Sequence, residues 1–221
     1  MSPRSPRTLR RCLPVALLGA AALVLPASAA AKATVATEAA ACPDLPTTQA
    51  FARYGDTADY ALAPGGDFEG SLAGWTLSNA HLAGQNESVG ILPGGSHSIA
   101  LGNSFFASGP STVTSPWFCV DPNHPYFRYM LKPNGPVGVL ATFVRYKNAA
   151  GQVIQSQITS KISPNLYTGK WTASQLNPLA VDLSIDGQQP SQVQLVFVSP
   201  GSVLGAGYYI DNILVDPYRR G

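Results

Sequence analysis

The chain has 221 residues, of which only 12% are charged, and it is rich in glycine (21) and proline (19). The formal net charge is +2, but four of the 14 basic residues precede residue 12. Without those four, ten basic residues stand against 12 acidic ones, for a formal net charge of −2. No basic stripe remains that could neutralise nucleic-acid phosphates, which excludes nucleic acid as the expected partner.

Residues 1–29 predict a secretory signal peptide. Four arginines precede an apolar run at 13–25, and Ala-Ser-Ala at 27–29 is a small-x-small cleavage site. The run is shorter than the roughly 20 residues that span a bilayer, although an uncleaved membrane anchor is the alternative. Residues 30–41 predict a poorly ordered spacer. We therefore expect a secreted protein, not inserted in a membrane after cleavage, with one folded domain at 42–221.

Two cysteines remain beyond the predicted signal peptide, Cys42 and Cys119. An even pair in an exported chain indicates a disulfide. Such a bridge would close a long loop, which the chain-entropy model values at about 4–5 kcal/mol. A lipidated Cys42 is the alternative, although it lies well past the apolar run.

Short alternating segments separated by turns dominate the chain from residue 75 onward, and no amphipathic helix is predicted. This pattern indicates an all-β domain, a two-sheet antiparallel β-sandwich rather than alternating β/α units. The strand expected at 191–198 alternates well, with Val193, Leu195 and Phe197 expected to face the core, and a further strand is expected at 207–215. The other expected strands lie at 75–84, 88–92, 97–101, 125–132, 137–146, 152–159 and 177–185.

The segment 137–146 predicts a surface that could bind a ligand. The preferred register turns Leu140, Thr142, Val144 and Tyr146 inward, which leaves Ala141, Phe143 and Arg145 outside, whereas a one-residue slip would exchange the two sets. Segment 125–132 is taken as the neighbouring strand, and it offers Arg128, flanked by Tyr126 and Met130. Arginine forks hydrogen-bond sugar hydroxyls or carboxylates and aromatic rings stack on sugars, so the predicted ligand-binding residues are Arg128, Phe143, Arg145 and Tyr126.

No arrangement of residues that would support catalysis emerges from the sequence. The three histidines, His81, His97 and His124, have no second His or Cys at metal-ligand spacing. Residues 94–98 (GGSHS) lack the Gly-x-Ser-x-Gly elbow of a serine nucleophile. Glutamate is scarce, whereas a glycosidase needs two carboxylates around the scissile bond. We therefore expect a protein that is not an enzyme.

Two short stretches near the ends of the domain resemble a known fold family. "GGDFEGSLAGW" (65–75) and "YYIDNILVDPY" (208–218) are similar to the two ends of a galactose-binding-like jelly roll, the fold of many carbohydrate-binding modules. From Cys42 to Arg220 the chain also resembles a group of small exported actinobacterial proteins with the same order of features: a first Cys, "GD…Y.L.PGG.FE", "SP..C", "HP..R" and a terminal "IDD.YVDPYRR".

The resemblance implies a role for the acidic residues beside Phe68. In such modules the Phe of the "FE" stretch packs between the sheets, while the next carboxylate binds a structural calcium together with an Asp near the last strand. Carried over, this places Phe68 inside and makes Glu69 and Asp211 calcium ligands, with Asp67 as a further candidate. Calcium takes six to eight oxygen ligands, which two carboxylates and loop carbonyls could supply. The alternative is that Glu69 and Asp211 only accept hydrogen bonds from backbone amides.

The function expected from these observations is non-catalytic recognition of a glycan or cell-surface polysaccharide. A structural or adhesive cell-surface protein that binds another protein is the alternative, and a secreted hydrolase is a third class. The same fold hosts many functions, so the residues of the site have to decide between them.

Overall fold

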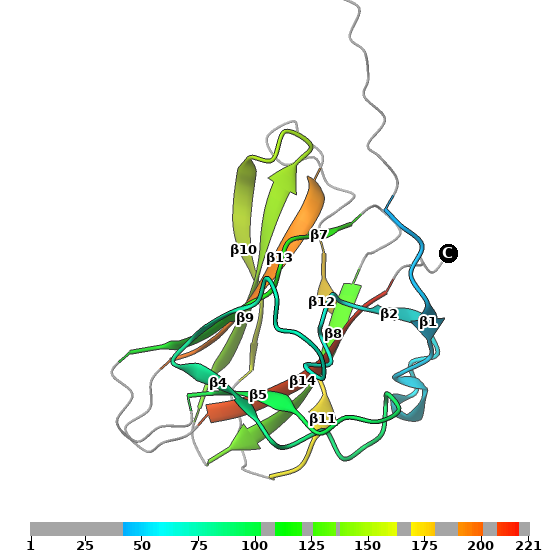
Figure 1. Ribbon diagram of the computed structural model, residues 1–221, viewed down its shortest axis with the longest axis vertical. Helices are drawn as coiled ribbons and strands as arrows, with labels where there is room; N and C mark the ends of the chain where they lie inside the picture. The colour runs from blue at the N-terminus through cyan, green and yellow to red at the C-terminus, as the bar shows by residue number, and fades with distance from the viewer. Residues whose placement is uncertain are drawn as a thin grey trace, which may run out of the picture. The chain divides into compact units, whose positions relative to one another are not determined.

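Two antiparallel β-sheets pack face to face in the computed structural model of the chain (Figure 1), which confirms the all-β sandwich prediction. The structure describes residues 42–102, 109–120, 126–135, 138–162, 169–179, 190–200 and 207–216, all within the compact unit 38–221, and in 154–162 it describes the backbone only. The predicted signal peptide and spacer lie outside the described residues. No helix in the described ranges has the length and apolar character needed to cross a membrane.

The first sheet is built around the last strand of the chain, and we call it the β14 sheet. Its main order is β1-β2-β14-β5-β4, with β8 also paired to β14 and with β11 and β12 paired to β8. The bounds are β1 Thr47–Thr48, β2 Tyr60–Leu62, β4 Ala80–Ala83, β5 Ser98–Leu101, β8 Tyr126–Asn134, β11 Thr172–Ala173, β12 Asn177–Pro178 and β14 Gly207–Asp216.

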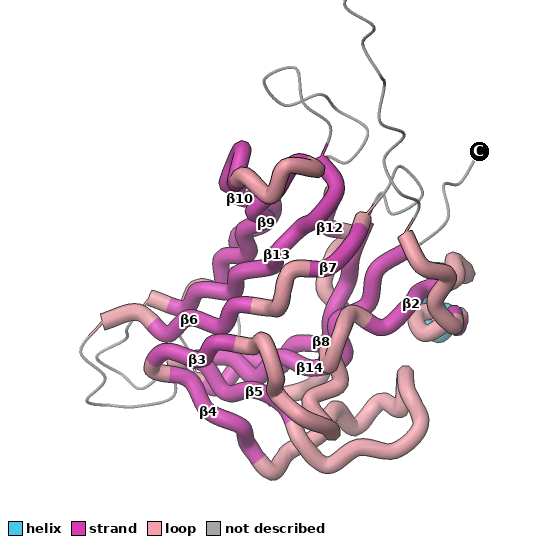
Figure 2. The backbone as a smooth tube through the Cα atoms, turned by 45° about the horizontal axis from the view of Figure 1, so that its top comes forward, coloured by secondary structure: helices cyan, strands magenta, loops and turns pink. Residues whose placement is uncertain are grey.

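The second sheet, called the β13 sheet, has the order β10-β9-β13-β6-β3, with β7 paired to β13. The bounds are β3 Thr76–Ser78, β6 Ser111–Thr114, β7 Phe118–Cys119, β9 Leu140–Asn148, β10 Val153–Ile162 and β13 Pro190–Ser199. In the described part of the chain, the tube in Figure 2 shows strands and loops apart from the short 3₁₀ helix Ala52–Tyr54.

Burial alternates along the strands as the sequence predicted. In β9, Leu140, Thr142, Val144 and Tyr146 are buried while the residues between them are half-buried, which confirms the preferred register. Side chains of β13 and β8 meet in the core, where the rings of Phe197 and Tyr129 lie edge to face, 5.0 Å between centroids. The predicted core positions Val193, Leu195 and Phe197 are fully buried.

Several expected strands have different limits in the structure. The segment 75–84 is not one strand: it turns a corner at Asn79, where φ is 49°, so that β3 joins the β13 sheet and β4 joins the β14 sheet. Leu82, which follows this corner, is 40% exposed. The stretch 88–92 forms bends rather than a strand. The expected strand 177–185 is described only to residue 179.

A second apolar cluster covers the outer face of the β14 sheet. Ala100, Met130, Tyr209 and Leu214 project from β5, β8 and β14 on the side away from the inter-sheet core. They pack against residues of the N-terminal segment and of loops, namely Ala50, Phe51, Tyr60, Ile91 and Trp171. Every residue of β14 is consequently buried.

The disulfide between Cys42 and Cys119 is present, with an S–S distance of 2.05 Å. It ties the start of the described chain to β7 at the edge of the β13 sheet. The bridge confirms the predicted pairing and excludes a lipidated Cys42 for the folded protein described here. Because its two cysteines are 77 positions apart, the bridge restrains a large part of the unfolded chain.

We predict that replacing both cysteines by serine lowers the free energy of unfolding by as much as about 4–5 kcal/mol, because the unfolded chain regains the entropy of a long open loop. Denaturant unfolding of the oxidised protein and of the double variant measures the difference. Coincident unfolding curves would show that the bridge contributes nothing to stability.

Candidate functional site

The glycine-rich stretch before Phe68 lies directly against the last strand. Ile213 in β14 donates a backbone hydrogen bond to Gly66 (2.9 Å), and its carbonyl accepts one from Ala63 (3.0 Å). A Cβ atom on residue 66 would lie 2.7 Å from the Ile213 carbonyl oxygen, so only glycine allows this approach. The two motifs that resemble the ends of a jelly roll therefore contact each other.

Phe68 is buried, as expected, but for a different reason than strand alternation. Residues 64–70 form turns and bends, and Phe68 has a left-handed backbone with φ of 57°. Its ring packs edge to face on Trp75 with 5.0 Å between centroids, and both residues belong to the inter-sheet core. The turn, rather than an extended segment, directs Phe68 inward and leaves Glu69 at the surface.

Glu69 accepts hydrogen bonds from the loop that precedes β5. Its Oε1 accepts from the backbone N–H groups of Ser96 (2.7 Å) and His97 (2.6 Å), and its Oε2 lies 3.0 Å from Nδ1 of His97. Burial alone would raise the pKa of Glu69, but the donors of His97 and Ser96 outweigh it and hold the pKa below its ordinary value. These contacts match the alternative reading of Glu69 as an acceptor of backbone hydrogen bonds.

Ser96, His97 and Glu69 do not form a nucleophile–base–acid chain. The Ser96 hydroxyl lies 2.9 Å from Nδ1 of His97, the same ring nitrogen that faces Glu69. In a Ser-His-acid triad the serine and the acid bind different ring nitrogens. The cluster therefore holds a loop and is not arranged for acyl transfer.

Asp211 is fully buried in β14, beneath the loop that begins at Glu87. Its Oδ2 accepts the backbone N–H of Glu87 (2.9 Å) and its Oδ1 accepts that of Asn212 (2.7 Å). Burial, together with the charges of Glu87 and Glu69, raises the pKa of Asp211 to about 7, against the opposing effect of the two N–H donors. The two residues between Asp211 and Leu214 depart from regular pairing, because the register to β8 shifts there. The first of them, Asn212, has a φ of 45°.

Glu87 is a structural residue that the sequence analysis did not single out. It is buried, and its carboxylate accepts backbone hydrogen bonds from Val89, Gly90 and Ile91 at 2.6 to 3.0 Å. This loop carries Ile91 into the outer apolar cluster. A carboxylate followed by four residues containing glycine is the only sequence signal of the capped loop, and it is too common to be decisive.

The predicted calcium ligands are coupled electrostatically, because the charge of Glu69 acts on Asp211. Asp67 is used locally, with its Oδ1 3.4 Å from the backbone nitrogen of Glu69. Within the described ranges, no three or more His, Cys, Asp or Glu side chains gather in a group that could hold a metal ion. Every carboxylate oxygen of Glu69 and Asp211 already has a donor, so calcium at these residues stays a prediction.

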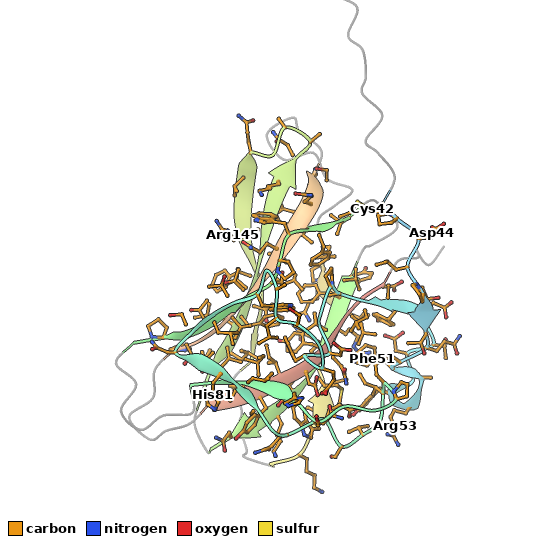
Figure 3. The ribbon with its side chains drawn as sticks, in the orientation of Figure 1. Cys42, Asp44, Phe51, Arg53, His81 and Arg145 are labelled. Atoms are coloured by element: carbon orange, nitrogen blue, oxygen red, sulfur yellow. A yellow bond between two sulfur atoms is a disulfide. The ribbon has the colours of Figure 1, made fainter. Side chains whose placement is uncertain are left out.

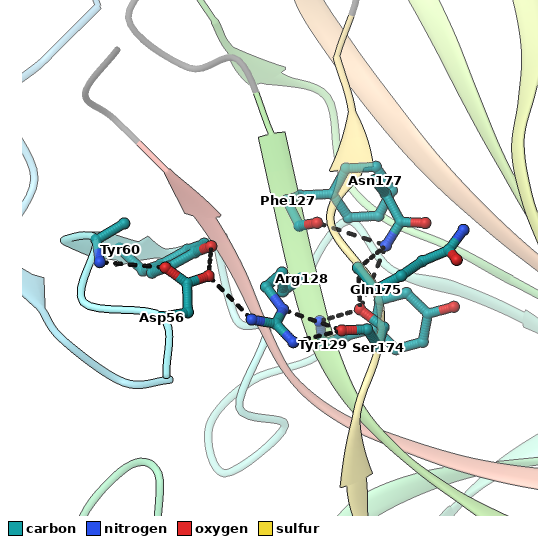
Figure 4. A network of polar contacts seen from close by, with 9 residues as sticks. Asp56, Tyr60, Phe127, Arg128, Tyr129, Ser174, Gln175 and Asn177 are labelled. Carbon is teal, nitrogen blue, oxygen red and sulfur yellow. Dashed lines mark hydrogen bonds and ion pairs between the residues drawn. The ribbon is translucent and has the colours of Figure 1, made fainter. Parts of the chain in front are cut away.

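Arg128 is bound on both sides by structural partners (Figure 4). Its Nη1 donates to Asp56 (2.9 Å), while Nε and Nη2 donate to the Ser174 carbonyl at 2.9 and 2.7 Å. The guanidinium also lies over the ring of Phe51, 4.6 Å from its centroid. With only 11% of its side chain exposed, Arg128 joins the N-terminal segment and the β11–β12 segment to β8.

The prediction that Arg128 and Tyr126 share a sheet face with Phe143 and Arg145 is wrong. Arg128 and Tyr126 lie on β8 in the β14 sheet, whereas Phe143 and Arg145 lie on β9 in the β13 sheet. The chain passes from one sheet to the other between Asn134 and Leu140 instead of forming a hairpin. Alternation is the same in either sheet, so the sequence could not show which strands are neighbours.

The outer face of the β13 sheet brings together a tryptophan, an arginine, a lysine and a glutamine. The ring of Trp117, which precedes β7, has the Lys147 ammonium at 4.1 Å and the Arg145 guanidinium at 5.8 Å from its centroid. Arg145 donates to the Gln194 side chain on β13 (2.9 Å), and Gln194 in turn donates to the Ser115 carbonyl (2.8 Å). In Figure 3, Arg145 lies by β9, well apart from Phe51 and Arg53 of the N-terminal segment.

Phe143 lies on the same face of β9 as Arg145, and it is half-buried. It pairs across the strands with Val196 of β13, while Arg145 pairs with Gln194 and Lys147 pairs with Gln192. We call this group, Trp117, Phe143, Arg145, Lys147 and Gln194, the Trp117 face. Sequence analysis identified Phe143 and Arg145 but left Trp117 unassigned, because a tryptophan between a proline and a short strand has no period to place it.

An apolar cavity of about 250 Å³ adjoins the disulfide. Trp117 lines this cavity and its ring also contacts the two cations of the Trp117 face. The other lining residues are Cys42, Pro43, Leu45, Ala61, Leu62, Ala63, Pro64, Phe118, Cys119 and Val215.

Comparison with known proteins gives structural similarities at low sequence identity. A family 61 carbohydrate-binding module in complex with β-1,4-galactotriose has a TM-score of 0.42 and 12% identity, covering 72% of this chain and 98% of that one. The family 11 carbohydrate-binding module of Clostridium thermocellum, in complex with a β-1,3-1,4-mixed-linked tetrasaccharide, has a TM-score of 0.43 and 14% identity, covering 70% and 95%.

The enzymatically active domain of the bacteriophage CBA120 tailspike protein 4 has a TM-score of 0.44 and 16% identity, with 69% of this chain covered. This chain spans only 21% of that tailspike chain. No protein-family model and no curated protein sequence matches. These TM-scores and identities are too low to assign a function, so the function is argued below from this chain's own residues.

We predict that Asp211 makes a contribution to stability that is lost as the pH rises from about 4 to 7, and that Asp211→Asn removes this contribution from the pH dependence. The pKa of Asp211 is 3.8 ordinarily and about 7 in the fold, so its ionised form costs more in the folded state than in the unfolded one. The contribution of Asp211 to the free energy of unfolding therefore falls between these two pH values and levels off above the higher one, so the wild type should lose stability relative to Asp211→Asn. Melting temperatures of both proteins across this pH range, in chelator, measure the effect.

The same measurement with calcium at pH 8 tests the predicted metal site. Binding to the native state alone would raise stability by about 2.7 kcal/mol at a hundredfold excess over Kd. The rise should disappear in Asp211→Asn. Equal melting temperatures with calcium and with chelator would leave Glu69 and Asp211 as hydrogen-bond acceptors only.

We predict that Arg128→Met destabilises the fold by about 3–5 kcal/mol, because it removes the Arg128 guanidinium from the buried carboxylate of Asp56. Arg145→Met is the matched control: its guanidinium contacts the Trp117 ring and the Gln194 side chain rather than a buried carboxylate, so its cost should stay at about 1 kcal/mol. Denaturant unfolding compares the two. Similar costs for both variants would contradict the structural role given to Arg128.

Proposed function

We propose that the protein is an exported, non-catalytic binding module and that its ligand is a glycan held on the Trp117 face. The observation that carries this proposal is the half-buried Trp117 ring beside the arginine and glutamine side chains of two neighbouring strands. Aromatic rings pack on the C–H surface of a sugar, and guanidinium and amide groups hydrogen-bond its hydroxyls. Both kinds of group are present here, because the Arg145 guanidinium contacts both the Trp117 ring and the Gln194 amide.

The contrast between the two sheets supports this location. The outer face of the β14 sheet is covered by its second apolar cluster, and Arg128 there is already bound to Asp56 and Ser174. On the outer face of the β13 sheet, Arg145 has one side-chain acceptor, Gln194, and Lys147 rests on an aromatic ring. Donors remain on this face for a ligand, since a guanidinium carries five N–H groups.

The disulfide fits export, because disulfides form and persist in oxidising compartments. It agrees with the signal peptide expected at residues 1–29. The glycan expectation also agrees with the sequence resemblance to carbohydrate-binding modules. The proposed site differs from the one predicted from sequence: it excludes Arg128 and Tyr126 and includes Trp117, Lys147 and Gln194.

A protein ligand is the second candidate, and the apolar cavity beside the disulfide favours it. Leu45 on the cavity wall is 45% exposed, and an apolar side chain of a partner could enter there. A protein ligand would occupy the cavity that Trp117 lines, whereas a glycan would occupy the Trp117 face. Leu45→Asp should abolish binding of a protein partner and leave glycan binding unchanged.

We predict that Phe143→Ala and Trp117→Ala each weaken glycan binding, screened on a glycan array and then measured by calorimetry. Removing a stacking ring loses contact area with the sugar but opens no cavity in the inter-sheet core. The matched control is Leu140→Ala on the opposite face of β9, where the side chain is fully buried. That variant should lose about 2–5 kcal/mol of stability while keeping its affinity below the unfolding temperature. Unchanged affinity in both aromatic variants would move the ligand off the Trp117 face.

A further inference from the structure

The charge on the β13 sheet has one sign. Its six strands contain Arg145, Lys147 and Lys161 but no aspartate or glutamate. The acidic residues that the structure describes lie instead in the N-terminal segment, in the loops at 56–69 and 87, and on β14. A domain whose mature part has a net negative charge thus keeps a positively charged sheet.

The two cations of the Trp117 face are neighbours on one strand. Arg145 and Lys147 are two residues apart on β9, which places their Cα atoms about 7 Å apart on the same face. Both head groups gather at the Trp117 ring. Among the residues that the structure describes, neither cation forms an ion pair with a carboxylate.

The side chain of Arg145 is held in place by Gln194 of the neighbouring strand β13. The Gln194 side chain accepts from Nη1 of Arg145 through its oxygen, and its nitrogen donates to the Ser115 carbonyl at 2.8 Å. Gln194 is 9% exposed, so this support is protected from water. The chain of contacts fixes the guanidinium while its other N–H groups stay available for a planar carboxylate.

Two half-buried cations that repel each other, and that have no carboxylate partner among the described residues, are a site for an added anion. A glycan with carboxylate groups would provide the anion and, in the same molecule, a sugar ring for Trp117. The ammonium of Lys147 can leave the indole for the carboxylate, because its four-carbon side chain is flexible and its charge is a compact point charge. A neutral sugar would leave the repulsion between Arg145 and Lys147 in place.

We infer that the glycan of the Trp117 face is an acidic one, a polymer of uronic acid residues, whose carboxylate binds Arg145 and Lys147 while the sugar ring packs on Trp117. This inference rests on the proposed function and specifies its ligand class. A polyuronate is favoured over a nucleic acid because the predicted mature domain has more acidic than basic residues, 12 against ten, whereas a nucleic-acid-binding domain carries an excess of basic residues.

The test compares two polymers with the same backbone, polygalacturonate and its fully methyl-esterified form, in calcium-free buffer with the full-length exported protein. We expect polygalacturonate to bind at least about tenfold more tightly, with an affinity that falls as salt is added. Arg145→Gln and Lys147→Gln should each reduce this preference by about tenfold and leave the melting temperature unchanged.

Lys132→Gln is the matched control. Lys132 also lies over an aromatic ring, 5.2 Å from the centroid of Tyr209, but it is on the β14 sheet. The same charge is removed there, so an equal loss of binding in Lys132→Gln would show a general charge effect and overturn the inference.

Other outcomes separate the inference from the proposed function. Equal binding of the two polymers, lost in Trp117→Ala, overturns the acidic ligand and keeps the glycan site. Absence of binding to both polymers and to every neutral glycan on an array overturns the proposed function itself. Binding of double-stranded DNA as tight as that of polygalacturonate, and unaffected by Trp117→Ala, would replace the glycan by a generic polyanion.

Discussion

The complete burial of β14 is the constraint on which the rest of this domain depends. All ten residues from Gly207 to Asp216 are buried, so both faces of the sheet around this strand must be covered. One face packs on the β13 sheet, with which it forms the inter-sheet core. The other face needs a second cover, and the chain provides it from segments without long strands or helices. Strands buried on both faces require this kind of cover, although it is more usual in parallel sheets with helices on each side.

Polar contacts inside the cover hold these irregular segments in position. Asp56 and Arg128 join the N-terminal segment to β8, and Asp211 binds the start of the loop that Glu87 then shapes. The three carboxylates are buried and Arg128 is half-buried, and each would be costly without its partners. Their cost is offset by Phe51, Ile91 and Trp171, which they help to place in the outer apolar cluster. The raised pKa of Asp211 is a consequence of this arrangement, because a carboxylate placed to hold a loop over a buried strand is also desolvated.

Covering one sheet has a direct consequence for function. Arg128 and Arg145 are chemically identical and are both flanked by aromatic rings, yet Arg128 is enclosed by the cover and Arg145 is not. The disulfide contributes to this division, since it draws the N-terminal segment toward β7 and Trp117 before that segment crosses to the β14 sheet. The candidate site therefore lies on the β13 sheet, outside the outer apolar cluster, at the Trp117 ring and the two cations beside it.

The sequence by itself determined the class of fold, the disulfide and the inward and outward sets of the long strands. These features follow from local rules: period-two alternation in β9 and β13, turn residues between strands, and a single pair of cysteines beyond the predicted signal peptide. The outward placement of Phe143 and Arg145 could be predicted in the same way, whereas the burial of Phe68 was implied by the family resemblance and is produced by a turn. Only the tertiary structure decided which strands are neighbours, and this separated Arg128 from Arg145 and brought Trp117, Lys147 and Gln194 to the site. The physical reason is that alternation specifies the two faces of a strand but carries no information about its sheet, which is set by long-range packing and by the cover that β14 requires.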